Sequence, residues 1–325
     1  GDGRRDRSSV AFGLATPAYV TLTILDGSTE VRHLVSAAAY GVGVTNVEWD
    51  GNGDGSTAVP DKSYEVVLEA VAQSNSGLRQ TERLTLTVDR VAPQIQLSSP
   101  ASAYVRGVEG VIGSITDLHL SSYALRLSGL DPVMATTEIA SGSDERIAFR
   151  FADLGGYADG LYRLDILAED EAENRGEGST QFVIDNTPPV VALTAPASGL
   201  LVSSKNGALD ITGTIDERNL KLFSLNLGQG APPYGSVLAS GASLPVSPTL
   251  HALNVAGLAD GGYTIQLRAE DKAGWMTETV ANIVVDNTPP IAVLRLPTDG
   301  SYVRSATDVV GTANDANLKN YALDI

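Results

Sequence analysis

The sequence contains no cysteine. Disulfides and thiolate metal sites are therefore excluded, so each folded domain of this chain must close around its own hydrophobic core. Thiol nucleophiles are excluded for the same reason. The lack of cysteine does not fix the compartment, because exported and cytosolic proteins alike can do without it.

Basic residues are scarce: 22 Lys and Arg stand against 39 Asp and Glu, which gives a net charge of −17. This charge repels a polyanion, so nucleic acid is not expected as a partner. The one basic run, Arg4-Arg5-Asp6-Arg7, is short and interrupted by an aspartate. We interpret it as a frayed terminus. The acidic excess favours cations instead, either diffuse counterions or bound Ca²⁺.

Long apolar runs are also absent. No stretch approaches the roughly 18 to 20 apolar residues of a membrane span, and the first residues do not resemble a signal peptide. We expect no membrane insertion within this segment, and an export signal or anchor outside it. With 43% hydrophobic and only 19% charged residues, the composition favours packed cores over disorder.

Catalytic motifs are missing as well. His33, His119 and His251 are far apart, and none has a second histidine at metal-ligand spacing. No Gly-x-Ser-x-Gly elbow occurs, and the Gly-rich stretches lack the lysine of a phosphate loop. The sequence therefore predicts that this chain is not an enzyme.

What the sequence does contain is a repeated junction, seen at residues 87–93, 183–189 and 284–290. The last two end in Asp-Asn-Thr-Pro-Pro, and the aspartates of the three copies lie 96 and 101 positions apart. A unit of about 100 residues has the size of an immunoglobulin-type sandwich and exceeds a solenoid repeat. The prolines end ladder hydrogen bonding and stiffen the passage into the next unit.

A polar segment that starts with glycine follows each junction and leads into an alternating run. A period of two predicts half-buried strands, which we place at residues 123–127, 222–227 and 321–325. Further on, an aspartate stands three residues before a tyrosine that opens another alternating run. The pairs are Asp61 and Tyr64, Asp159 and Tyr162, and Asp260 and Tyr263.

This spacing resembles the tyrosine corner of immunoglobulin domains, without the cysteine that follows it in antibodies. Leu164 and Ile265 occupy that place here. We therefore predict an all-β chain of tandem immunoglobulin-like β-sandwich domains in an extended array. The expected domains are 1–90, which is divergent, 91–187, 188–287, and the start of an incomplete domain at 288–325.

Residues 88–325 resemble the Ig-like repeats of large bacterial surface and adhesin-type proteins, in which Val-Asp-Asn-Thr-Pro-Pro and Glu-Asp-x-Ala-Gly-Asn recur. The first unit resembles the Ig-like domain of the flagellar hook-capping scaffold protein, through residues 31–34, 47–51 and 60–64. These resemblances imply a fold rather than a role. They also imply an extracellular location at a bacterial cell surface.

An Asp- and Gly-rich loop near residue 50 matches the calcium-loop pattern, with oxygen donors at positions 1, 3, 5, 7 and 12 and glycine at position 6. Its candidate ligands are Asp50, Asn52, Asp54, Ser56 and Asp61. Position 12 is aspartate rather than glutamate, and no helices are predicted beside it. The alternative is a solvated turn in which Asn and Gly supply positive φ angles.

A second kind of calcium site is predicted at the junctions. In an Ig-like topology the incoming linker and two loops meet at one end of a domain, and carboxylates converging there repel unless a metal, water or protons neutralise them. The alternative is that they cap turns and bind nothing. The two predicted groups are Asp89, Asp117, Glu169 and Asp170, and Asp185, Asp216, Glu217, Glu270 and Asp271.

The function that these patterns predict is a non-catalytic structural and adhesive stalk that presents a binding or effector region. The expected partners are a glycan or protein of a host or neighbouring cell, or other copies of the same protein. One alternative is an accessory region of an extracellular enzyme or toxin. Another is a carbohydrate-binding module, in which Trp275 or Trp49 stacks on a sugar ring.

Overall fold

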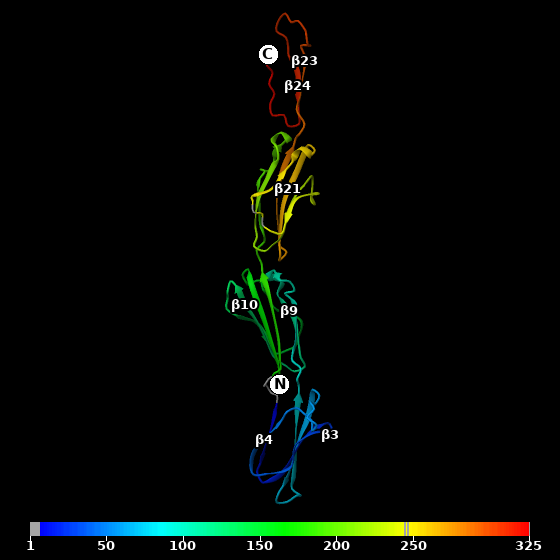
Figure 1. Ribbon diagram of the computed structural model, residues 1–325, viewed down its shortest axis with the longest axis vertical. Helices are drawn as coiled ribbons and strands as arrows, with labels where there is room; N and C mark the ends of the chain where they lie inside the picture. Colours follow the sequence, from blue (N-terminus) through cyan, green and yellow to red (C-terminus); the bar gives the residue numbers. More distant parts are fainter. Residues whose placement is uncertain (1–6, 244, 246, 325) are drawn as a thin grey trace. The chain divides into compact units, whose positions relative to one another are not determined.

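The computed structural model describes residues 7–243, 245 and 247–324. Within them the chain forms twenty-four β-strands and three short 3₁₀ turns (Figure 1). The prediction of an all-β, tandem sandwich fold is confirmed. No helix in the described part is long and apolar enough to cross a membrane. The chain divides into two compact units, Gly1–Asp185 and Asn186–Ile325.

The first unit begins with a sandwich of a four-stranded and a two-stranded sheet, which we call the first sandwich. The strand orders are β3-β2-β5-β6 and β1-β4, and both sheets contribute to one core around Leu22, Ile24, Trp49 and Tyr64. The strands are β1 (Ser8–Leu14), β2 (Ala18–Asp26), β3 (Thr29–Tyr40), β4 (Gly43–Trp49), β5 (Lys62–Ala72) and β6 (Arg79–Val88).

The second sandwich completes this unit with a five-stranded sheet, β11-β10-β13-β14-β8, and a three-stranded sheet, β12-β9-β7. Tyr123, Leu125 and Leu127 are buried at alternate positions of β10, as the period of two predicts. The elements are β7 (Gln94–Ser99), β8 (Tyr104–Val105), η1 (Gly107–Glu109), β9 (Val111–Thr116), β10 (Leu120–Asp131), β11 (Thr137–Gly142), β12 (Arg146–Ala152), β13 (Gly160–Asp170) and β14 (Arg175–Ile184).

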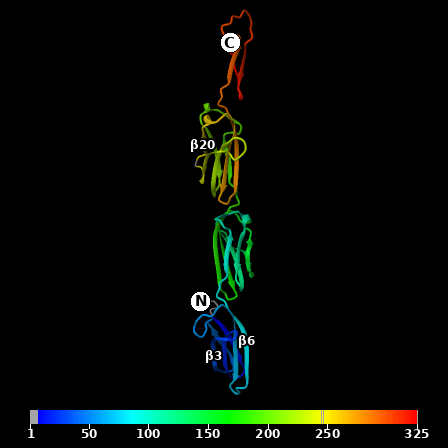
Figure 2. The same ribbon diagram turned by 90° about the vertical axis from the view of Figure 1, so that its right-hand side faces the viewer.

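The third sandwich, in the second unit, repeats this plan. Its sheets are β16-β22-β21-β18-β19 and β15-β17-β20, and its core forms a separate cluster. Figure 2 labels β20, a strand of the three-stranded sheet. The elements are β15 (Val190–Ala195), β16 (Leu200–Val202), η2 (Ser204–Asn206), β17 (Leu209–Asp216), β18 (Leu220–Gly228), β19 (Ser236–Gly241), β20 (Thr249–Leu253), η3 (Val255–Gly257), β21 (Gly261–Asp271) and β22 (Met276–Val285).

The second unit ends in a hairpin of β23 (Ile291–Leu296) and β24 (Val310–Asn314). The strand predicted at residues 321–325 is wrong for residues 321–324, which form no strand, while Ile325 lies outside the described residues. The corresponding strands β10 and β18 each hydrogen-bond to two neighbours. No strand in the described part pairs with residues 321–324, so their backbone groups have no ladder to join.

The tyrosine corner is present in all three sandwiches. In each, the phenol donates a hydrogen bond to the carbonyl of the residue four positions earlier and so ties down the loop before the strand. The bonds are Tyr64 to Pro60 at 2.8 Å, Tyr162 to Ala158 at 2.9 Å and Tyr263 to Ala259 at 3.1 Å. Leu164 and Ile265 are fully buried, so hydrophobic packing occupies the place of the antibody cysteine.

Candidate functional site: the linkers and the loops beside them

Three aspartates from three segments meet at one end of the second sandwich. Asp89 lies in the linker after β6, Asp117 in the loop between β9 and β10, and Asp170 at the end of β13. One carboxylate oxygen from each lies within 4.8 Å of the others. The fold therefore brings together three of the four residues predicted for this junction, and Asp170 is almost completely buried.

The fourth predicted residue, Glu169, is paired with the guanidinium of Arg175. Successive side chains of a strand point to opposite faces, and Glu169 directly precedes Asp170 on β13. This alternation explains why only Asp170 joins the cluster.

The cluster has its own hydrogen-bond partners. His119 Nδ1 lies 2.6 Å from Asp89 Oδ2, and the Asn174 side chain donates to Asp170 Oδ2 at 2.7 Å. Burial, together with the charges of Asp170 and Asp89, raises the pKa of Asp117 above its ordinary value. The hydrogen bond to Asp89 raises the pKa of His119. The arrangement therefore suits positive charge, from an imidazolium or from a hard cation.

The other predicted junction group lies in both units. Asp185 belongs to the first unit and is buried. In the second unit Glu217 and Asp271 are buried, and they accept backbone hydrogen bonds from Asn219 at 2.6 Å and Trp275 at 2.9 Å.

The other two members of this group differ from that buried pair. Asp216 is exposed, and Glu270 accepts a bond of 2.6 Å from Lys221 Nζ. Within the second unit, Glu217 and Asp271 are thus the residues that correspond to Asp117 and Asp170.

In the loop from Asp50 to Asp61, the predicted calcium ligands are directed to protein partners. Asp50 accepts from Asn52, both from its backbone N–H at 3.1 Å and from its side chain at 3.0 Å. Asp54 accepts from the His33 backbone N–H at 3.0 Å. This contact is the largest cause that lowers the pKa of Asp54.

Ser56 and Asp61 are the other two predicted ligands of that loop. Ser56 has a positive φ of 56°, in keeping with a tight turn. Asp61 binds the guanidinium of Arg90. No metal-type cluster forms among these residues in the described part of the chain.

Arg90 is a further residue of this region, which the sequence patterns above do not single out. Its Nη1 donates to Asp61 Oδ1 at 2.6 Å, and its backbone N–H donates to Asp61 Oδ2 at 2.9 Å. One difference between the repeated junctions does point to it: Arg90 follows the junction aspartate where the later copies have Asn186 and Asn287.

The two tryptophans have different environments. Trp49 is buried in the core of the first sandwich, with Tyr64 packed edge-on at 5.7 Å and its indole N–H bonded to the Asn52 carbonyl. The prediction that Trp49 is an exposed platform is therefore wrong, because β4 points this side chain between the two sheets. Trp275 is partly buried in the turn between β21 and β22.

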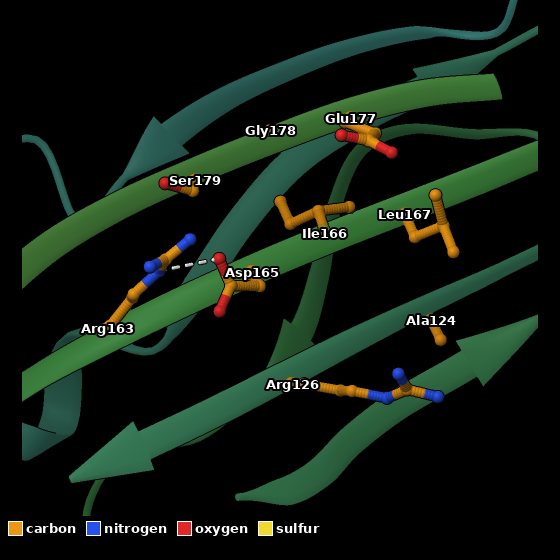
Figure 3. Close-up of a pocket in the computed structure, with 9 residues that line it drawn as sticks. All are labelled: Ala124, Arg126, Arg163, Asp165, Ile166, Leu167, Glu177, Gly178 and Ser179. Atoms are coloured by element: carbon orange, nitrogen blue, oxygen red, sulfur yellow. Dashed lines mark hydrogen bonds and ion pairs between the residues drawn. The ribbon is translucent and has the colours of Figure 1, made fainter.

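A shallow depression lies on the outer face of the second sandwich, over β10, β13 and β14 (Figure 3). Its lining mixes charged residues, Arg126, Arg163, Asp165 and Glu177, with small and aliphatic ones. Arg163 Nε donates to Asp165 Oδ1 at 2.8 Å, a hydrogen bond that Figure 3 marks. None of the nine residues that line it is aromatic. No residue predicted for a site lies there.

Comparisons with known proteins find similarity in structure. No protein-family model matches the chain, and no curated protein matches it. A tetra-tandem repeat from the extending region of a large adhesion protein matches 91% of this chain and 74% of its own length, at 18% identity and a TM-score of 0.35.

Two further structures show the same kind of similarity. Part of a 1.5-MDa bacterial ice-binding adhesin matches 87% of this chain and 91% of its own length, at 15% identity and a TM-score of 0.31. Extracellular cadherin domains 3–6 of protocadherin gamma B2 match 87% of this chain and 76% of their own length, at 13% identity and a TM-score of 0.32.

Proposed function

We propose that this chain is a non-catalytic stalk segment of a large secreted or cell-surface bacterial protein, and that it presents a binding or effector region. The observation that supports this proposal is the repetition of one building plan. The second and third sandwiches have the same strand order in both sheets, with separate cores. Repetition of a self-sufficient domain adds length without a new active site. The likeness of residues 1–90 to the hook-capping scaffold domain stays a prediction about fold.

Force spectroscopy on the chain, held at its two ends, tests the mechanical part of this proposal. We expect separate unfolding events, each releasing about 30 nm, since a fully extended chain spans at most 3.3 to 3.6 Å per residue and each sandwich with its linker has about 90 to 100 residues. One cooperative event for the whole chain would contradict a stalk built of independent units.

The adhesive part is tested with beads that carry this chain alone. We expect them to bind glycan- or protein-coated surfaces no better than bare beads, because in our proposal the binding region lies outside these residues. Binding to a glycan that is lost in Trp275→Ala would contradict the stalk and support a carbohydrate-binding module. Trp275→Phe keeps an aromatic ring and serves as the matched control.

We also propose that Ca²⁺ binds the cluster of Asp89, Asp117 and Asp170. Carboxylate oxygens are ligands that Ca²⁺ accepts, in sets of six to eight oxygens, and three such groups converge here. Titration of Ca²⁺ into the chelator-treated chain, followed by calorimetry, is expected to show heat of binding. This heat should be lost in the double variant Asp89→Ala, Asp170→Ala. The exposed Asp153→Ala is the control. Absence of heat with the unaltered chain would overturn this assignment.

A further inference from the structure

We propose that the first linker (residues 89–93) and the third linker (residues 286–290) are two-sided clamps. In each, one residue hydrogen-bonds to the loop that follows the linker, and the next residue hydrogen-bonds to the sandwich that precedes it. In the backward half, the aspartate of the Asp-x-x-Tyr motif is the docking group. This inference deepens the proposed stalk function, and its test below can fail independently of that function.

The backward half of the third linker is formed by Asn287 and Thr288. Asp260 Oδ1 accepts from the Asn287 backbone N–H at 2.7 Å, and Asp260 Oδ2 accepts from the Thr288 hydroxyl at 2.5 Å. The Asn287 side chain donates to the carbonyls of Val255 at 3.1 Å and Leu258 at 3.3 Å. Asp260 and Tyr263 therefore share one motif but have different tasks, since the tyrosine fixes the loop and the aspartate fixes the linker.

The carbonyl oxygen of the Asn287 side chain is used as well. Asn287 Oδ1 accepts from the Ser204 backbone N–H at 2.8 Å. This one side chain thus contacts η2 and η3, two turns that lie far apart in the sequence. Such a side chain holds the linker in register with the sandwich rather than merely capping a local turn.

The first linker makes the same backward connection with a different residue. Asp61, at the position of Asp260, accepts from both the backbone and the guanidinium of Arg90. The guanidinium also donates to the carbonyls of Val59 and Gly51, each at 2.9 Å. The guanidinium of Arg90 thereby makes the kinds of contact that the Asn287 amide and the Thr288 hydroxyl make in the third linker.

The Gly-rich loop near residue 50 is shaped to receive this guanidinium. Gly51 has a φ of +71°, and a Cβ there would lie 2.8 Å from Arg90 Nη2. A larger residue at this position would therefore be strained and would collide with Arg90. The loop that resembles a calcium site thus has a second interpretation, in which a cation of the chain itself occupies the docking place.

The forward half uses the preceding aspartate in both linkers. Asp89 Oδ1 accepts from the Val91 N–H at 3.1 Å, and Asp286 Oδ1 accepts from the Thr288 N–H at 3.2 Å. The second oxygen of Asp89 lies 2.6 Å from His119 Nδ1, in the polar loop that follows β9. The second oxygen of Asp286 accepts from Asn317 Nδ2 at 2.7 Å, in the polar segment that follows β24.

His119 and Asn317 occupy the same position of that loop, six residues after Gly113 and Gly311. The backbone N–H of each donates to the carboxylate two residues earlier, Asp117 at 2.8 Å and Asp315 at 2.7 Å. The loop is thereby held in the shape that faces the linker. Consecutive linker residues with opposed, hydrogen-bonded side chains have little freedom to act as a hinge.

Distances between two spin labels test the first clamp in the full chain. The chain has no native cysteine, so Thr85→Cys and Ser143→Cys, both at exposed positions, introduce the only two labelling sites. We expect a broader distribution of label distances in Asp61→Ala and in Arg90→Ala than in the unaltered pair. Arg79→Ala, which removes an exposed ion pair of the same sandwich, is the matched control. The measurement is made in chelator, so that the result does not depend on Ca²⁺.

Asp61→Asn is the second variant, because it keeps the size of the side chain and serves if Asp61→Ala unfolds the first sandwich. Circular dichroism identifies that case. Equal distribution widths in the unaltered pair and in every folded variant at Asp61 and Arg90 would overturn the clamp.

Amide exchange tests the third clamp. In Asp260→Ala the protection of the Asn287 amide is expected to fall about tenfold, as when one hydrogen bond of ordinary net strength is lost. Asp210→Ala, at an exposed position of the same sandwich, should leave it unchanged. Unchanged protection in Asp260→Ala would overturn the clamp. If the clamp measurements succeed while the force and bead experiments fail, the clamp stands and the stalk function does not.

Discussion

At the scale of single residues, a few polar side chains with repeated partners hold the loops and linkers. The corner tyrosines all donate to the carbonyl four residues earlier, and the motif aspartates Asp61 and Asp260 accept from linker residues. These bonds recur although the surrounding sequences differ. Their recurrence indicates that the backbone geometry, rather than the local composition, selects the residue.

The corner bond is expected to have a measurable effect on stability. Tyr162→Phe removes a hydroxyl whose bond to Ala158 is 2.9 Å long, while it keeps the buried ring. We expect the second sandwich to lose about 0.5 to 1.5 kcal/mol of unfolding free energy, the usual net value of such a bond. Urea unfolding followed at amides of β13 measures it, and Tyr302→Phe at a fully exposed position is the control.

The third linker is expected to depend on pH through Asp260. The hydrogen bond from Thr288, and then that from the Asn287 backbone, lower the pKa of Asp260 below its ordinary 3.8. A lowered folded-state pKa means that the carboxylate stabilises the fold above the unfolded pKa, and that this contribution is lost as the pH falls through the folded pKa.

The comparison with Asp260→Asn isolates this effect. The difference in melting temperature between the unaltered chain and this variant should be constant near neutral pH and shrink below about pH 4. A difference that grows on acidification would contradict the assignment.

At the scale of elements, the first linker also depends on close backbone contact with a strand. A Cβ on Gly176, at the second position of β14, would lie well inside contact distance of the Pro93 carbonyl oxygen at the end of the first linker. Only glycine allows β14 and this linker to approach so closely. The start of β14 thus contacts the first linker at Pro93, and the sequence patterns do not predict this contact.

Gly176→Ala is therefore expected to displace the linker from β14. Overpacking of this kind costs about 1 to 3 kcal/mol, which should lower the urea midpoint of the second sandwich and speed amide exchange at Gln94 and Ile95. At Gly156 a Cβ would meet nothing within 4 Å, so Gly156→Ala is the control. Equal midpoints for the two variants would show that the linker yields without cost.

At the scale of the whole molecule, the absence of cysteine leaves each sandwich to its own core. The buried residues form three separate clusters, and the two compact units divide inside the second junction. Stability is then expected to be a sum of contributions from the separate cores.

Leu225→Ala tests this independence. Leu225 is fully buried in the third sandwich, so its truncation is expected to cost about 2 to 5 kcal/mol there. The unfolding of the first unit, followed at amides of β13 and β14, should not change. A parallel loss of stability in the first unit would show that the units are coupled. The exposed Lys221→Ala is the control within the same strand.

Much of the fold was predictable because it depends on short-range patterns. The alternation of Tyr123, Leu125 and Leu127 predicts β10. The tyrosine corners are predicted by an aspartate three residues before each tyrosine. The prediction failed at residues 321–324, because an alternating pattern specifies which face is buried but not whether a neighbouring strand is present to accept its hydrogen bonds.

The candidate sites were predictable only in part. Asp89, Asp117 and Asp170 could be grouped by threading, since the topology places their segments at one end of a sandwich. Glu169 could not be separated from Asp170, nor Trp49 recognised as a core residue, without knowing which way each strand faces. The ligands of the loop near residue 50 match a motif, yet its last carboxylate is held by Arg90, 29 positions later.

By itself, the sequence determined the all-β class, the repeat length and the positions of the corner and linker motifs, because these follow from local periodicity and spacing. Only the tertiary structure decided which acidic side chains meet and which are neutralised by the chain's own cations. Coulombic and hydrogen-bonding interactions act between atoms a few ångströms apart, and strands from distant parts of the chain determine those distances.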